Sequence, residues 1–223
     1  YWIDQILPDL RRDLKIPLIV SVGYTKEDMK VLIPKLQGFC DGFEVSTHYV
    51  GLDLKNIKET VHVITSLTDK PVFMKVSPHM PDPVEFAHAV KDNGAKGIVA
   101  MNSLGPAVKI DLDRRKVIAG NQKGEVWMSG PVIKPMALAL VSRIKDAMPD
   151  FTVIGTGGIS SAEDVVEFLL AGADAVQMLS AAMLKGHELY RRIIDDLSFV
   201  LEKHKFESVR DVIDTPLIKG EVK

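Results

Sequence analysis

Lys75 is a candidate for chemistry because it stands inside an apolar run, PVFMKVSP, that predicts a buried strand. An ammonium group in such surroundings needs an anionic or electron-rich neighbour, which a bound ligand would supply. The alternative is a structural lysine that extends to solvent or pairs with a buried carboxylate such as Glu44. The position of Lys75 near the end of its strand favours the functional interpretation.

Glycines in a second run suit the binding of an anion. Gly157 and Gly158 separate the apolar run FTVIG from a predicted helix, so backbone N–H groups and the helix N-terminus would face a phosphate. The alternative is a plain tight turn, since paired glycines alone are a weak signal. Two other loops, Ser129–Gly130 and Leu179–Ser180, would complete the contacts. The three loops together predict a phosphate-bearing cofactor.

Two more apolar runs end in polar side chains. The stretch GFEVSTHYVG contains Ser46, His48 and Tyr49, and GIVAMNS ends in Asn102 and Ser103. Hydroxyl, imidazole and phenol groups move protons, whereas an asparagine offers donors and an acceptor to an amide-like or carboxylated ring. The alternative for Asn102 is a turn former. The sequence has no metal-site spacing such as HxH, HExxH or CxxC.

Strand and helix signals alternate along the chain and define six strand–helix units. Their apolar runs are continuous, as in buried parallel strands, which indicates an α/β protein. A doubly wound sheet and a (β/α)8 TIM barrel both fit, and the six units together with the absence of an initiator methionine favour a barrel that lacks its first two strands in the chain as given. We expect residues 1–223 to be a single, N-terminally incomplete domain. The insert at about 104–126 is expected to be irregular and mobile.

The C-terminal ends of the strands carry the active site in a barrel. This rule adds Ser21 to the candidates above. It places Cys40, at the start of its strand, on the opposite face, so we interpret Cys40 as a structural thiol. A capping box from Ser160 to Glu163 is predicted to begin the helix that follows Gly158.

The composition is that of an ordinary globular protein. The chain has 223 residues, of which 46% are hydrophobic and 26% charged, and its net charge of −2 predicts no nucleic-acid partner. The apolar runs are shorter than the roughly 20 residues that cross a membrane, so no membrane partner is expected. A single cysteine excludes an internal disulfide and favours a reducing, cytoplasmic location.

Four motifs resemble those of a known family, the soluble, FMN-dependent dihydroorotate dehydrogenases, together with the related barrel domain of dihydropyrimidine dehydrogenase. The resemblance extends from about Ile16 to Arg192. The motifs are PVFMKVSP, AMNSLGPAVKIDLDRRK, MSGPVIKPMALALV and VIGTGGISSAEDVVEFLLAGADAVQMLSA. The resemblance implies FMN as the cofactor and pyrimidine biosynthesis as the setting.

The resemblance also assigns roles to residues of this chain. Lys75 would contact the flavin and stabilise its reduced form, and Asn102 and Ser103 would hold the pyrimidine. The residues implied in cofactor binding are Ser21, Ser46, Lys75, Met101, Ser129, Gly130, Gly157, Gly158, Leu179 and Ser180. The reaction that the family carries out removes a hydride and a proton from adjacent ring carbons, and it needs a base that titrates near the working pH.

The loop that should carry this base departs from the family. The family pattern E-L-N-x-S-C-P-N becomes E-V-S-T-H-Y-V-G here, with Tyr49 at the position of the cysteine and His48 before it. We hypothesise that His48 and Tyr49 take over the acid–base role, alone or as a relay. The alternative is that the loop has lost dihydroorotate chemistry and serves another substrate.

The expected partners are a dihydropyrimidine-like small molecule, a second copy of the chain in a homodimer, and an iron–sulfur and flavin electron-transfer subunit. The chain has no cysteine cluster, so such an iron–sulfur centre would lie in another protein. Two other functions fit the sequence. One is a non-redox, phosphate-binding aldolase or isomerase in which Lys75 is the reactive lysine, and the other is a flavin subunit that turns over only with its partner.

Overall fold

The computed structural model describes residues 1–23, 25–47 and 51–220. Six parallel strands form one sheet in the order β1-β2-β3-β4-β9-β10. They are β1 (Ile19–Val22), β2 (Gly42–Ser46), β3 (Val72–Lys75), β4 (Gly97–Ala100), β9 (Thr152–Thr156) and β10 (Ala175–Gln177). Neighbouring strands are in register with their C-terminal ends on the same side, so that Ser46 of β2 lies opposite Lys75 of β3.

The sheet curls as in a barrel. Gln177 lies on the edge strand β10, yet its side chain donates a hydrogen bond to Glu44 of β2, near the other edge. Only a curved sheet brings these strands together through its interior. The α/β TIM-barrel fold predicted from the sequence is therefore confirmed, and a flat doubly wound sheet is excluded. Six strands of the barrel lie in the described residues, and β1 and β10 are the edges.

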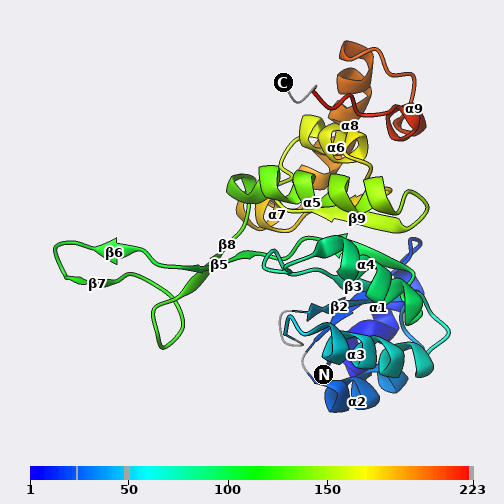
Figure 1. Cartoon of the computed structure of the whole chain (residues 1–223), viewed down its shortest axis with the longest axis vertical. Helices are drawn as coiled ribbons and strands as arrows, with labels where there is room; N and C mark the ends of the chain where they lie inside the picture. Colours follow the sequence, from blue (N-terminus) through cyan, green and yellow to red (C-terminus); the bar gives the residue numbers. More distant parts are fainter. Residues whose placement is uncertain (24, 48–50, 221–223) are drawn as a thin grey trace.

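Helices cover the outside of the sheet (Figure 1). The helical segments, in chain order, are η1 (Trp2–Ile6), α1 (Leu7–Asp13), α2 (Lys26–Leu36), α3 (Leu54–Ser66), α4 (Pro83–Asp92), η3 (Pro131–Ile133), α5 (Lys134–Ala147), α6 (Ala162–Leu170), α7 (Ser180–Lys185), α8 (Glu188–Lys203) and α9 (Val209–Asp214). Thr25 and Asp82 accept backbone N–H groups at the starts of α2 and α4, as their sequences predict. The predicted capping box from Ser160 to Glu163 is wrong by one residue, because Ser161 and Asp164 form it.

Apolar side chains from the strands and helices pack into one core. Phe43 of β2, Met74 of β3 and Ile98 of β4 are fully buried, and Phe86 of α4 and Phe168 of α6 pack on the outside of the sheet. Most side chains of the six strands are apolar, and β2, β3, β9 and β10 each end in a polar residue. The core therefore fixes the strand ends, and with them the loops that carry the candidate residues.

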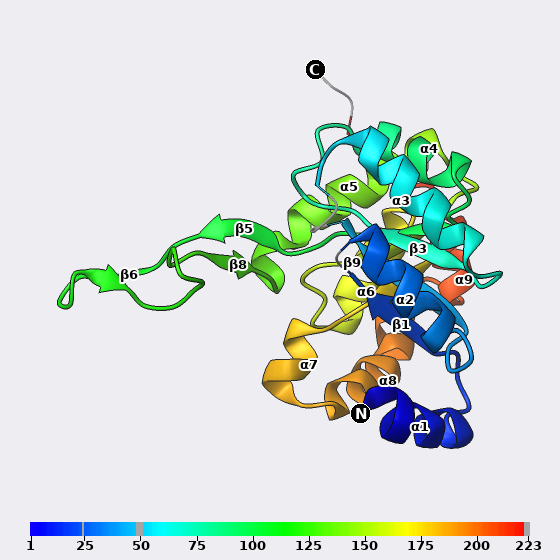
Figure 2. The same ribbon diagram turned by 90° about the horizontal axis from the view of Figure 1, so that it is seen from below.

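The insert forms an arm that projects from the body (Figures 1 and 2). Its strands are β5 (Leu104–Ala107), β6 (Ile110–Asp111), β7 (Lys116–Val117) and β8 (Val126–Met128), which pair antiparallel as β5 with β8 and β6 with β7. The expectation of an irregular insert is thus wrong, while its mobility stays a prediction. The His79 ring forms a hydrogen bond with the carbonyl oxygen of Gly105 at the base of the arm.

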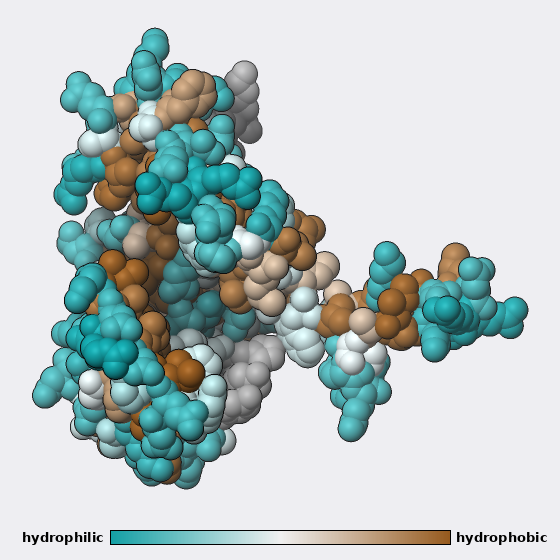
Figure 3. All heavy atoms as spheres, turned by 180° about the vertical axis from the view of Figure 1, so that it is seen from behind, coloured by the Kyte–Doolittle hydropathy of each residue, from teal (hydrophilic) through white to brown (hydrophobic). Residues whose placement is uncertain are grey.

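One side of the body is hollowed, and apolar side chains gather along the hollow (Figure 3). Exposed apolar residues also occur on α8, where Tyr190, Ile194 and Phe199 are exposed, and at Trp2 on η1. Among the helices of the described residues, none has the length and apolar character needed to cross a membrane.

Candidate active site

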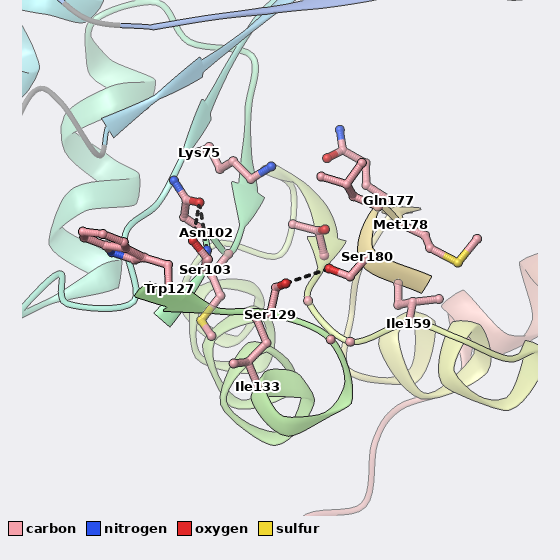
Figure 4. Close-up of a pocket in the computed structure, with 16 residues that line it drawn as sticks. Lys75, Asn102, Ser103, Trp127, Ser129, Ile133, Ile159, Gln177, Met178 and Ser180 are labelled. Atoms are coloured by element: carbon pink, nitrogen blue, oxygen red, sulfur yellow. Dashed lines mark hydrogen bonds between the residues drawn. The ribbon is translucent and has the colours of Figure 1, made fainter. Parts of the chain in front are cut away.

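Two adjoining cavities open at the C-terminal ends of the strands, with volumes of about 270 and 540 Å³. They share Lys75, Asn102, Ser103 and Trp127 (Figure 4). The other candidates in the larger cavity are Ser21 and Ser46, and those in the smaller one are Met101, Ser129, Gly130, Gly157, Gly158, Leu179 and Ser180. The site residues predicted from the sequence therefore converge, apart from His48 and Tyr49, which lie outside the described residues.

Lys75 is paired inside the site. Its Nζ donates a hydrogen bond to Glu44 Oε1 at 3.1 Å, and the carboxylate also accepts hydrogen bonds from Gln177 Nε2 at 3.0 Å and from Ser21 Oγ at 3.4 Å. The Glu44 residue is 6% exposed, whereas the Lys75 side chain is 21% exposed and lines both cavities. The pairing with Glu44, considered from the sequence as a structural alternative, thus coexists with a position in the site.

Asn102 is held at the end of β4 by backbone and side-chain hydrogen bonds. Its N–H donates to the Val76 carbonyl at 3.0 Å, which extends the pairing with β3 beyond the strand. Its Nδ2 donates to Ser46 Oγ at 3.0 Å, and its Oδ1 accepts from the Ser103 N–H at 2.8 Å. The turn-forming and ligand-binding interpretations of Asn102 are therefore compatible.

Thr47 fixes the chain just before the two undescribed candidates. Its residue is 1% exposed, and its hydroxyl donates to the carbonyl oxygen of Lys75 at 2.7 Å. The last described residue of this stretch is thus tied to the end of β3. The segment that continues with His48 therefore starts beside the strand end that carries Lys75.

The glycine turn after β9 has a backbone that side chains disfavour. Gly157 and Gly158 have φ angles of +124° and +93°, and a Cβ on Gly158 would lie 2.8 Å from the carbonyl oxygen of Gly130. The turn therefore packs directly on the loop that carries Gly130. On the other side of the smaller cavity, Ser180 Oγ donates to Ser129 Oγ at 2.8 Å (Figure 4). The three predicted phosphate loops thus face one space.

An ion pair behind the glycine turn holds it in place. Asp164 accepts hydrogen bonds from the N–H groups of Ser160 and Ser161 and from Lys134 Nζ, which is 2.6 Å away. Burial raises the pKa of Asp164, but the hydrogen bonds from Lys134 and Ser160 outweigh burial and leave the pKa below its ordinary value. Lys134 also pairs with Glu167, and these carboxylates raise its pKa. Asp164 is therefore a charged anchor for the turn.

Cys40 lies just before β2, at its N-terminal end, and is 1% exposed, so the prediction of a structural thiol is confirmed. Burial raises its pKa, which makes it a poor nucleophile or base. Sequence reasoning missed Gln177 and Trp127 as cavity residues. Gln177 could have been found as the polar residue that ends an apolar strand, whereas Trp127 stands in the arm and gave no periodic signal.

Fold and site together define an α/β barrel enzyme whose loops suit a phosphate-bearing cofactor. Residues 5–201 match the sequence model of the family called dihydroorotate dehydrogenase. The chain is 37% identical to the dihydroorotate dehydrogenase B (NAD(+)) catalytic subunit of Pyrococcus horikoshii over 211 residues, which are 90% of this chain and 68% of that protein. It is 31% identical to the dihydroorotate dehydrogenase A (fumarate) of Lactobacillus helveticus over 228 residues, 95% of this chain and 73% of the relative.

The chain belongs to the dihydroorotate dehydrogenase family. It is therefore an FMN-dependent oxidoreductase that acts on a CH–CH group. The structure fits this cofactor in two respects. Gly130, Gly157 and Gly158 line the cavity with backbone alone, and no atom lies within 4 Å of a Cβ built on Gly130. Lys75 lines the same cavity and would present a cation to an electron-rich ring bound there.

Proposed function

We propose that the chain interconverts the single and double C–C bond of a dihydropyrimidine-like ring, with FMN as the redox group. The observation that carries this proposal is the shared cavity wall: Lys75, Asn102 and Ser103 line the space that also meets the glycine turns. A flavin with its phosphate at the turns would have its ring system near Lys75. Asn102 and Ser103 would then be available to the substrate ring, because they line both cavities.

The residues divide the work by their chemistry. Gly157, Gly158 and Ser180 offer backbone N–H groups and a hydroxyl to the phosphate. FMN, when bound, would supply the hydride acceptor for the reaction. Lys75 stabilises negative charge on the flavin, because its ammonium reaches the cavity from the end of β3. Asn102 and Ser103 bind the polar edge of the ring and orient it.

We assign the proton transfer to His48 and Tyr49, in keeping with the sequence prediction. Both follow Thr47, whose hydrogen bond to Lys75 ties this segment to the site. The ordinary pKa of a histidine, about 6.5, suits a base at neutral pH, and a tyrosine, at about 10, suits a relay. Reduction of the bound flavin in His48→Ala and Tyr49→Phe proteins tests this. If both variants keep the wild-type reduction rate, the assignment is wrong.

The proposed partners follow from the same site and from the arm. Dihydroorotate dehydrogenase B relatives are named as catalytic subunits, which supports an electron-transfer partner for this chain as well. A homodimer is the second proposal, and it is supported by the exposed apolar residues of the arm, which include Val108, Ile110 and Leu112. Light scattering of the purified chain with and without Leu112→Asp tests it, since a charge in the interface would give a monomer.

The proposed function is tested with purified protein loaded with FMN. A flavin absorption spectrum is expected, and anaerobic addition of dihydroorotate, dihydrouracil or dihydrothymine should bleach it for the ring that is the substrate. The three rings differ in their substituents, so their relative rates identify the substrate class. A flavin that none of them bleaches would overturn the proposal for dihydropyrimidines while leaving FMN binding intact.

The ion pair at Lys75 weighs against an aldolase-like function. A reactive lysine attacks a carbonyl carbon with a free amine, whereas Lys75 Nζ donates a hydrogen bond to Glu44 Oε1 at 3.1 Å. Borohydride trapping with a carbonyl compound distinguishes the two functions. A colourless protein that forms a reduced adduct at Lys75 would favour the aldolase.

A further inference from the structure

Glu44 joins four strands of the curled sheet through one carboxylate. It stands on β2, pairs with Lys75 of β3, and accepts hydrogen bonds from Ser21 of β1 and Gln177 of β10. The residue is nearly buried, and it lines the larger cavity beside Lys75. A buried carboxylate with three side-chain donors has a fixed place, because each donor would lose its partner if the carboxylate moved.

The Glu44 carboxylate also affects the electrostatic field inside the cavity. The Lys75 ammonium and the Glu44 carboxylate are 3.1 Å apart, so their fields partly cancel at any group bound in the cavity. Gln177 draws the second carboxylate oxygen toward β10 at 3.0 Å, which keeps Oε1 directed at Lys75. The Glu44 carboxylate is therefore placed where it weakens the field of the Lys75 ammonium at a bound group.

We propose that Glu44 is a positioning residue that holds the Lys75 ammonium and moderates its charge toward the bound flavin, and so lowers the flavin's midpoint potential. This inference rests on the proposed function, because it needs the flavin ring near Lys75. A lone ammonium would favour the electron-rich, reduced flavin more strongly than the pair does. The pair therefore keeps the flavin reducible by the substrate and still able to pass its electrons on.

The test is the midpoint potential of FMN bound to the full chain, measured by equilibration with a reference dye. Glu44→Gln keeps the size of the side chain and one acceptor oxygen and removes its charge, so the potential should rise above that of the wild type. Glu44→Asp retains the charge but draws it back from Lys75 by one methylene, so its potential should lie between the two. Glu59→Gln is the matched control, because Glu59 pairs with Lys26 at 2.8 Å on the outer surface, and no shift is expected there.

Action through Lys75 is tested in a second background. Lys75→Met should lower the potential, and Glu44→Gln should then have no further effect, because the charge that Glu44 moderates is gone. A change in stability alone would leave all these potentials equal. If Glu44→Gln does not fold, Glu44→Asp decides the question, since a potential above that of the wild type supports the proposal.

The outcomes separate this inference from the proposed function. A chain that binds no FMN overturns the proposed function and the inference with it. The inference alone is overturned if the chain binds FMN and a dihydropyrimidine bleaches the flavin, but the midpoint potential of the flavin is the same in the wild type and in Glu44→Gln. A rise that persists undiminished in the Lys75→Met background also contradicts it, because Glu44 would then act on the flavin directly.

Discussion

The two walls of the cavity are made of different parts of the chain. The wall after β9 is backbone: Gly157 and Gly158 take φ angles that only glycine adopts easily, and Asp164 holds the turn through N–H groups. The wall at β3 and β4 is made of side chains, in which Glu44 holds Lys75. Both walls contain a lysine paired with a nearly buried carboxylate, at 2.6 Å for Lys134–Asp164 and 3.1 Å for Lys75–Glu44.

This difference indicates a division of labour. A backbone wall recognises an anion such as a phosphate. It tolerates little change at Gly158, because a Cβ there would lie 2.8 Å from Gly130 and Lys134. A side-chain wall can change its residues and thereby its ring substrate or its redox properties without loss of the fold. Substitutions of glycines in the first wall should therefore weaken cofactor binding, and substitutions in the second wall should alter catalysis or the flavin's midpoint potential.

The largest effect is expected for Gly158→Ala. The new Cβ would lie 2.8 Å from the Gly130 carbonyl oxygen, at a φ of +93°. Strain of about 3 kcal/mol would weaken FMN binding by about 100-fold. Quenching of flavin fluorescence on binding measures this, and Gly38→Ala is the control because a Cβ at Gly38 meets no atom within 4 Å. Unchanged affinity in Gly158→Ala would show that the turn does not contact the cofactor.

The second-largest effect is expected for Asp164, which anchors the glycine turn of the same wall. Asp164→Asn should lower the free energy of unfolding by about 2 kcal/mol at pH 7, because a charged partner of Lys134 and of two backbone N–H groups is lost. Urea denaturation measures the change. Asp195→Asn, which breaks an exposed pair with Arg191, should cost less than about 0.5 kcal/mol.

The pH dependence of this effect has a defined sign. The pKa of Asp164 is lowered in the folded protein, so its stabilisation is complete above the unfolded pKa of about 3.9 and is lost as the pH falls through the folded pKa. The stability difference between the wild type and Asp164→Asn should therefore be constant near neutral pH and shrink in acid. A difference that grows toward acid would contradict the role of the charged carboxylate.

A smaller effect is expected in the side-chain wall at Asn102. Asn102→Ala removes groups that would meet the substrate ring and should raise KM by about 10-fold, or about 1.4 kcal/mol, with little change in FMN affinity. Steady-state kinetics with the active dihydropyrimidine and an FMN titration measure the two quantities. Asn93→Ala at the end of α4 is the control. Equal losses in FMN affinity and KM would place Asn102 at the cofactor instead.

The smallest effect is expected at Trp127, which lines both cavities from the base of the arm and is 39% exposed. Trp127→Phe should raise KM by about threefold, because a smaller ring keeps part of the contact. The sequence has two tryptophans, so Trp2→Phe leaves Trp127 as a single fluorescent probe. Its emission should fall when FMN binds, and unchanged emission would place the indole away from the cofactor.

Much of this fold could be predicted from the sequence because local and long-range signals agree. The strands are short apolar runs, and the helices begin at residues such as Thr25 and Asp82 that cap them. The capping box at Ser161 was misplaced because Ser160 and Glu163 have the same spacing and chemistry as Ser161 and Asp164. The arm was missed because its pairs, such as β6 with β7, are too short for a periodic signal.

Part of the candidate site could also be predicted from the sequence. Lys75, Asn102 and the glycine turn stand at strand ends, and barrel geometry brings all strand ends together. The contact between Glu44 and Gln177 was harder to predict from the sequence. Gln177 lies 133 residues away along the chain and reaches Glu44 only because the sheet is curved. No local sequence pattern indicates that contact, because it depends on the three-dimensional curvature of the sheet.

The division between the two walls is tested most directly by comparing FMN with riboflavin, which has the same ring system without the phosphate. We predict that the wild-type chain binds FMN at least about tenfold more tightly, since charge-assisted hydrogen bonds to a phosphate contribute about 1.5–3 kcal/mol each. Gly158→Ala should lose this preference and Lys75→Met should keep it. Equal affinity of the wild type for FMN and riboflavin would contradict the account.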